Sequence, residues 1–194
     1  KVMNLTLRVL SIVPQTTQHG CVVGLKQNES LVVVGTTNME NQTVNVIKIS
    51  RNFRLNEFTK SNTAIRLGID NTPSAEVLQQ LEWLCLRVLQ PVRDHFGKSV
   101  QISSGYRSLK LNRSLGSSDN SQHTTGNAAD LEIFGIDNYV LACWIRDNLD
   151  FDQLVLEFYD GTPDSGWVHV SFKETGNRME CLTIGKGATR RGLK

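Results

Sequence analysis

The spacing of apolar residues changes near residue 51 of this 194-residue chain. Up to that point, apolar and polar positions alternate in short runs, which is the period of a β-strand with one buried face. Turn-forming residues such as Pro14, Asn28 and Asn38 separate these runs. We therefore expect a small all-β module over residues 1–50, with strands at residues 5–13, 21–25, 30–35 and 43–49.

Beyond residue 51, apolar residues also recur at helical spacing. Residues 70–74 combine a capping side chain with a proline that a first helical turn tolerates, so they predict the start of a helix. Its apolar face is formed by Val77, Leu81, Leu84 and Val88. We expect Pro91 to kink or end this helix before a short continuation to residues 95–97.

Strand and helix patterns then alternate along the rest of the chain. Strands are expected at residues 99–103, 128–133, 153–158, 167–172 and 180–184, and helices at residues 109–115 and 138–149. Because the final strands follow one another without helices, we predict an α+β domain over residues 51–185, with a largely antiparallel sheet and flanking helices. Residues 186–194 contain four basic residues and are expected to form a flexible tail.

Composition narrows the functional class. An apolar content of 39% and a charged content of 21% are typical of a soluble globular protein with a real core. A net charge of +2 is too small to indicate a nucleic-acid partner, and no apolar run is long enough to span a membrane. The apolar stretch at residues 5–13 is interrupted by polar residues and lacks a following cleavage site, so no signal peptide is expected. The four scattered cysteines indicate neither a disulfide framework nor a zinc ribbon.

Candidate chemistry lies in two of the strands and in the loop between residues 121 and 127. Strand alternation places Asp130 opposite the apolar Ala129 and Leu131, and it places His169 on a face with Trp167 and Ser171, away from Val168 and Val170.

The loop histidine His123 precedes Gly126, which allows the backbone to turn back toward Asp130. Two imidazoles and a carboxylate are ligands that zinc accepts, and three protein ligands leave a fourth position for water, as in catalytic sites. A hydrogen-bonded His–Asp pair without a metal remains the alternative from these residues alone.

Three motifs in order make the chain resemble a known family. They are Ser104-Gly105-Tyr106-Arg107-Ser108, the segment Ser121-Gln122-His123 followed by Gly126, Ala128 and Asp130, and Trp167-Val168-His169-Val170-Ser171. Together they resemble the zinc D-alanyl-D-alanine carboxypeptidases, a group that includes VanX-like dipeptidases and many phage endolysin peptidases. The resemblance covers about residues 51 to 175 and leaves residues 1–50 outside it.

The resemblance implies a role for each matching residue. His123, Asp130 and His169 would hold zinc, which would lower the pKa of a bound water and polarise the scissile carbonyl. Arg107 would offer a planar fork to a substrate carboxylate or to the developing oxyanion; a turn arginine bonded to backbone carbonyls is its alternative role. Ser121, Gln122 and Trp167 would line the substrate pocket.

The general base departs from the family pattern. Relatives often place a glutamate three residues before the last histidine or a histidine two residues before it, and here Gly166 and Trp167 occupy these positions. We expect Glu157 to replace them, because it ends an otherwise hydrophobic strand whose apolar neighbours would raise its pKa, as a proton shuttle requires. Asp160 and Asp164 are alternatives in an expected turn.

These features favour a zinc metallopeptidase that hydrolyses peptidoglycan stem peptides, at a D-Ala-D-Ala bond or another amide such as L-Ala-D-Glu. A phage lysin or virion-associated lytic protein, made in the host cytoplasm and acting at the wall, fits the expected lack of a signal peptide. Residues 1–50 would direct it to the wall or fix it to other virion proteins. One alternative is a structural virion or binding protein that keeps the peptidase fold with little turnover. The other is a metal-binding signalling domain, since the hedgehog amino-terminal domain shares the fold.

Overall fold

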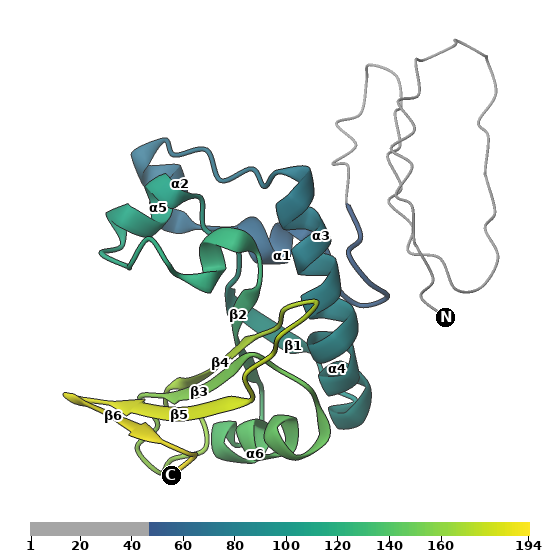
Figure 1. Cartoon of the computed structure of the whole chain (residues 1–194), viewed down its shortest axis with the longest axis vertical. Helices are drawn as coiled ribbons and strands as arrows, with labels where there is room; N and C mark the ends of the chain where they lie inside the picture. Colours follow the sequence, from purple (N-terminus) through teal and green to yellow (C-terminus); the bar gives the residue numbers. More distant parts are fainter. Residues whose placement is uncertain (1–46) are drawn as a thin grey trace, which may run out of the picture.

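The computed structural model of the chain describes residues 47–194, and within them one mixed sheet organises the fold (Figure 1). Its six strands run in the order β1-β2-β4-β3-β5-β6. They are β1 Val100–Ser104, β2 Ala128–Ile133, β3 Gln153–Glu157, β4 Trp167–Ser171, β5 Glu180–Gly185 and β6 Ala188–Arg191. All neighbouring pairs are antiparallel except β3 and β5, so the predicted α+β fold with a largely antiparallel sheet is confirmed. The β module predicted for residues 1–50 lies almost entirely outside the described residues.

Helices precede the sheet and fill its connections. They are α1 Leu55–Thr59, α2 Asn62–Leu67, α3 Ala75–Leu84, the π-helix η1 Cys85–Leu89, α4 Gln90–Phe96, α5 Leu109–Ser114, the 3-10 helix η2 Gln122–Thr125 and α6 Asn138–Asn148. The predicted helix start is confirmed, because the Ser74 side chain accepts the N–H of Val77 at the beginning of α3. Along the described residues, no helix combines the length and apolar character needed to cross a bilayer.

The long helix does not end at Pro91. Instead α3 continues through the π-helical turn η1 into α4, which reaches Phe96. The N–H of Gln90 bonds the carbonyl of Cys85, five residues earlier. Proline has no N–H to donate to a helical ladder, and a π-turn immediately before it is a known way to absorb such a defect. The helix that was expected to kink or end at Pro91 therefore continues, and only its hydrogen-bonding pattern changes at residues Cys85–Leu89.

The core lies between this long helix, α6 and one face of the sheet. The helices contribute fully buried residues such as Leu81, Val88 and Ile145, and the sheet contributes Leu131 and Val170. Burying such a side chain stabilises the fold by about 1.5–3 kcal/mol relative to leaving it exposed. Because alternate residues of β2 and β4 point into this core, the residues between them face the opposite side of the sheet.

A second group of short helices lies over the end of the sheet farthest from β5 and β6. Figure 1 shows α2 and α5 together there, and a small apolar cluster of Ala64, Ile69 and Leu111 joins them. The connection from β1 to β2 carries both α5 and η2, and so holds two of the three motifs found in the sequence. The face of β2 and β4 opposite the core therefore lies next to residues of the β1–β2 connection.

The flexible tail expected at residues 186–194 contains strand β6. Backbone pairing joins β6 to β5 from Leu182 opposite Arg191 to Gly185 opposite Ala188. All four residues of β6 are exposed, and charged side chains are a common feature of edge strands because they discourage pairing with other chains. The basic residues of this segment led us to expect a solvated tail. A strand ladder is formed by backbone hydrogen bonds, so β6 can pair with β5 while its side chains stay in solvent.

Candidate active site

Two residues of the candidate site come directly from the sheet. Asp130 on β2 and His169 on β4 are register partners, and partners in an antiparallel pair project their side chains to the same face. His169 Nδ1 lies 2.8 Å from Asp130 Oδ1. Both side chains are on the face opposite the core, as the alternation of apolar residues predicts.

His123 arrives from η2 in the connection before β2. Gly126 ends this 3-10 helix with a φ of 77°, and a Cβ at that position would lie 2.8 Å from the carbonyl oxygen of Val77. Glycine therefore allows the sharp return that brings His123 Nε2 to 3.3 Å from Asp130 Oδ1. On its other side, His123 Nδ1 donates to the carbonyl of Gly105 at 2.7 Å. Because a carbonyl oxygen only accepts, Nδ1 carries a proton, and Nε2 is the atom that would ligate a metal.

The three residues form a group that could hold a metal ion. One ligand atom from each of His123, Asp130 and His169 lies within 4.8 Å of the other two, and their exposed fractions are only 4%, 7% and 8%. Zinc ligands lie about 2.0–2.2 Å from the ion, so tetrahedral donor atoms are separated by roughly 3.4 Å. The observed contacts of 2.8 and 3.3 Å are close to this spacing. The donor types and their separations fit zinc.

The electrostatics favour an ionised carboxylate at the centre of this group. Burial alone would raise the pKa of Asp130, but hydrogen bonds to His123 and His169 outweigh it and hold the pKa well below its ordinary value. Arg107 adds an ion pair, with Nη2 at 3.1 Å from the second oxygen, Oδ2. Asp130 thus has one oxygen facing the two imidazoles and the other facing a guanidinium.

Arg107 is held by the turn that carries it. Its Nε and Nη2 donate to Ser104 Oγ at 2.9 and 2.7 Å, and its backbone N–H donates to the carbonyl of His123 at 3.1 Å. Two of the donors expected for a substrate carboxylate therefore bond protein groups, and Nη1 has no acceptor among residues 47–194. Ser104 was not predicted as a partner of Arg107, because the contact depends on the shape of the turn.

Asn71 is a further residue whose role the sequence did not indicate. Its Oδ1 accepts the N–H of Ser108 at 2.7 Å, and its Nδ2 donates to the carbonyls of Thr59 and Tyr106 at 2.9 and 3.1 Å. These bonds brace the segment that contains Gly105 and Arg107. In the sequence Asn71 belongs to a helix-start pattern, which gave it a local capping role and concealed these long-range contacts.

Glu157, the candidate general base, lies on the same face as the histidines. It is the register partner of Trp167, and Val155, two residues earlier, is the partner of His169. Burial raises the pKa of Glu157, and the charge of Asp130 adds to this rise, while His169 and Arg107 partly offset it. Asp160 instead accepts bonds from Thr162 within an exposed turn.

Position 166, one of the two at which the resemblance implies a proton-transferring side chain, cannot hold a side chain here. Gly166 has a φ of 64°, and a Cβ built on it would lie 1.9 Å from the backbone oxygen of Glu157. An acidic residue at position 166 would therefore require the backbone to move. The close approach of these two segments explains why glycine occupies position 166.

Trp167 and Phe158 form an aromatic wall beside Glu157. Their ring centroids are 5.2 Å apart, and Phe158 has a φ of 55°, a conformation that a bulky residue adopts only when its surroundings hold it. The indole Nε1 of Trp167 is buried without an acceptor among the described residues. A buried donor without a partner is uncommon in folded proteins.

Ser121 and Gln122 line a hollow of about 530 Å³ that also reaches His169. The structure therefore places both predicted pocket residues beside the candidate metal group. Gln122 Nε2 donates to Asp152 Oδ2 at 2.9 Å, so this amide is held in place by a carboxylate that the sequence did not single out. Substrate binding by these residues stays a prediction.

Comparison with known protein families identifies a match for this chain. The family model described as Peptidase M15 matches residues 51–171, which is more than half of the chain. The matched segment contains all three members of the candidate metal group as well as Arg107 and Glu157. No curated protein matches the chain.

Proposed function

The chain belongs to the peptidase M15 family, and on that premise we propose that it is a zinc-dependent hydrolase of peptide bonds in bacterial peptidoglycan. The observation that carries the proposal is the convergence of His123, Asp130 and His169 on one point beside a solvent-accessible hollow. Structural zinc sites usually have four protein ligands, whereas three ligands next to a hollow are typical of a catalytic site.

The two histidines and the aspartate would hold the metal. A zinc ion bound there supplies a water of lowered pKa and polarises a carbonyl oxygen. Asp130 stays ionised because of its hydrogen bonds, and the bond to the Gly105 carbonyl orients the His123 ring so that Nε2 faces the site. These contacts preorganise the ligands before metal binding.

Glu157 would accept the proton of the attacking water and return it to the leaving amine. A carboxyl with a pKa above its ordinary value is suited to both steps, because near neutral pH it accepts a proton more readily than a fully solvated carboxylate does and can still pass that proton to the leaving amine. Arg107 would hold Asp130 in place through Oδ2 and present its remaining Nη1 to the substrate. Trp167 would donate its indole N–H to the bound peptide.

The substrate we infer is a stem peptide, cleaved at D-Ala-D-Ala or at another amide such as L-Ala-D-Glu. This rests on the three motifs that resemble the D-alanyl-D-alanine carboxypeptidases and their phage relatives. On the same basis we infer a phage lysin or a virion-associated lytic protein, with residues 1–50 binding the wall or other virion proteins.

The second candidate function is a virion or binding protein that keeps the fold with little turnover. The observation that favours it is Gly166, since the acid that relatives carry at this position is absent. Under this alternative the protein would bind metal and peptide but release no products.

Digestion of purified sacculi separates the two functions. The zinc-loaded protein is incubated with sacculi, and released fragments are identified by mass spectrometry, with the chelated protein and His123→Ala as controls. Release of D-Ala or stem fragments that is lost in both controls supports the peptidase. Stoichiometric zinc binding without any released fragment supports the binding protein.

A further inference from the structure

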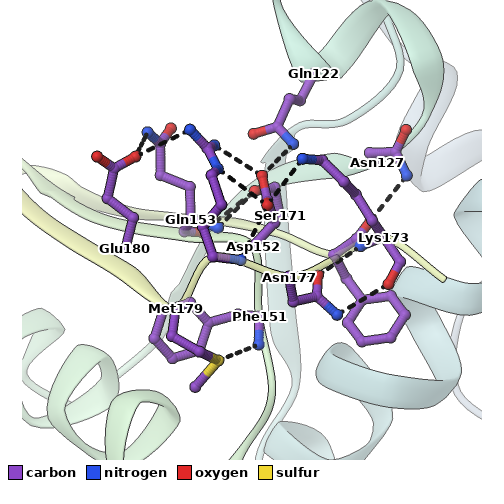
Figure 2. A network of polar contacts seen from close by, with 12 residues as sticks. Gln122, Asn127, Phe151, Asp152, Gln153, Ser171, Lys173, Asn177, Met179 and Glu180 are labelled. Atoms are coloured by element: carbon purple, nitrogen blue, oxygen red, sulfur yellow. Dashed lines mark hydrogen bonds and ion pairs between the residues drawn. The ribbon is translucent and has the colours of Figure 1, made fainter. Parts of the chain in front are cut away.

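A second buried aspartate lies beside the candidate active site. Asp152 is completely buried and sits immediately before β3. Arg178 donates to it from Nε at 3.0 Å and from Nη2 at 2.7 Å, and Gln122 Nε2 donates at 2.9 Å. Lys173 Nζ forms an ion pair with it at 2.9 Å. Figure 2 shows Gln122 and Lys173 converging on Asp152 from two different segments.

Two cations, Lys173 and Arg178, contact the one buried carboxylate. The fork of Arg178 alone provides one hydrogen bond to each oxygen of Asp152, which is the strong bidentate arrangement. Arg178 Nη1 is also paired with Glu180 at 3.2 Å. Lys173 is therefore an additional cation, and its ammonium has three donors of which one is directed at Asp152.

The two cations face the hollow next to the candidate metal group. Lys173 and Arg178 line it together with Ser121, Gln122 and His169, and none of the residues that line it is acidic. The side chains of Lys173 and Arg178 keep 41% and 49% of their surface exposed, whereas that of Asp152 keeps none. A ligand in the hollow thus meets Lys173, whose counter-charge Asp152 lies beneath the surface, whereas Arg178 also pairs with the partly exposed Glu180.

We propose that Lys173, oriented by Asp152, is the cation of a subsite that binds a carboxylate of the substrate close to the scissile bond. This inference rests on the proposed peptidase function and specifies its substrate as an anionic peptide. A half-exposed ammonium with spare donors attracts a carboxylate while remaining partly hydrated. The carboxylate has two sources in a stem peptide, namely the C-terminus and the free α-carboxylate of an internal D-Glu.

Two matched pairs of synthetic peptides test the subsite. In one pair the C-terminal carboxylate is replaced by a carboxamide, and in the other the α-carboxylate of the internal D-Glu is replaced. The kcat/KM of each peptide is measured for the full-length zinc-loaded protein and for Lys173→Met, Lys173→Arg and Lys186→Met. Lys186 lies in an exposed segment between β5 and β6 and is the control for loss of a distant positive charge.

The wild type is expected to prefer the carboxylate member of one pair by about tenfold, equivalent to ~1.4 kcal/mol. Lys173→Met should cleave both members of that pair at the rate of the carboxamide, while Lys173→Arg and Lys186→Met keep the preference. The peptide pair whose carboxylate preference is lost in Lys173→Met shows whether the subsite binds the C-terminus or the D-Glu α-carboxylate. Thermal unfolding checks that each variant is folded, and Lys173→Gln replaces Lys173→Met if the latter is not.

Two results would show that Lys173 does not form a carboxylate subsite. If the wild type cleaves both members of both pairs equally, or if Lys173→Met keeps the preference, the subsite is wrong and the peptidase function stands. If the wild type cleaves no peptide, the proposed function fails, and calorimetric binding of the same peptides decides the subsite. Tighter binding of the carboxylate member that is lost in Lys173→Met then supports it, and equal binding overturns it.

Discussion

Two buried aspartates on one side of the sheet have opposite kinds of partners. Asp130 is approached by two imidazoles, His123 and His169, with Arg107 on its second oxygen. Asp152 is approached by two permanent cations and an amide. In both cases the pKa of the carboxyl is held well below its ordinary value, so both groups are ionised at neutral pH.

The difference lies in what the partners can still bind. A neutral imidazole has a lone pair that ligates a metal, whereas an ammonium or guanidinium group has only donors. The surroundings of Asp130 therefore suit a cation, and those of Asp152 suit an anion. Gln122 and His123 are consecutive residues of η2 and contact one aspartate each, so the same short helix connects a candidate metal site to a candidate anion subsite.

Removing an imidazole from the first region should have the largest effect. We expect His169→Ala to lose bound zinc and all measurable hydrolysis, because two remaining ligands hold the ion weakly. Zinc content by mass spectrometry and fragment release from sacculi measure both effects. The control is His95→Ala, an exposed histidine stacked on Trp144, which should keep zinc and activity. Full zinc occupancy in His169→Ala would contradict the assignment.

Glu157→Gln should come next, with kcat lowered by about 10²–10⁴-fold, the usual contribution of a general base. Zinc content should not change, because Glu157 is not a member of the metal group. In the wild type the base must be ionised, so activity should rise with pH through a pKa above the ordinary 4.5. Loss of this acidic limb in the variant is the supporting result. An unchanged pH–rate profile would point to another residue as the base.

Arg107→Lys should reduce kcat/KM by roughly 10–100-fold, the range typical for groups that orient a metal ligand. Lysine keeps the charge beside Asp130 but cannot also bond Ser104 Oγ through a planar fork. Steady-state kinetics with one stem peptide measure the loss. Arg113→Lys, whose ion pair with Asp119 is exposed, is the matched control and should behave as the wild type. Equal kinetics for both variants would exclude an orienting role for Arg107.

Asp152→Asn should have the smallest effect on hydrolysis and a clear effect on stability. Loss of its bonds to Arg178 and Lys173 should lower the free energy of unfolding by about 1–3 kcal/mol at neutral pH. Burial alone would raise the pKa of Asp152, but those bonds and that of Gln122 outweigh it.

The stabilisation by Asp152 is therefore complete above the ordinary pKa of 3.8 and is lost as pH falls through the lower folded pKa. The difference in unfolding free energy between wild type and Asp152→Asn, measured by urea denaturation, should shrink below about pH 4. A difference that does not change with pH would show that the carboxylate charge is not what stabilises the fold.

Much of the first region followed from the sequence, because β-strand alternation places side chains on one face or the other. The alternation around Asp130 and His169 predicted that they share a face, and the structure makes them register partners. Gly126 likewise predicted the return of the loop that carries His123. The alternation could not show that Arg107 Nε and Nη2 donate to Ser104 and Asp130.

In the second region only Gln122 was predicted, as a pocket residue, and its contact with Asp152 was not. Asp152 precedes a strand, and its partners Lys173 and Arg178 belong to the connection between β4 and β5. Such a network depends on how loops fold over one another, which has no sequence period. The same reason applies to β6, where backbone pairing rather than side-chain pattern forms the strand.

On the proposed function, Asp130 is a metal ligand and Asp152 is not. Zinc titration calorimetry of the matched variants Asp130→Asn and Asp152→Asn tests it most directly, since each removes one negative charge from a buried carboxylate. We predict one zinc per chain in the wild type, a similar affinity in Asp152→Asn, and an affinity at least about 100-fold weaker in Asp130→Asn. Equal zinc affinity in the two variants would show that Asp130 is not a zinc ligand.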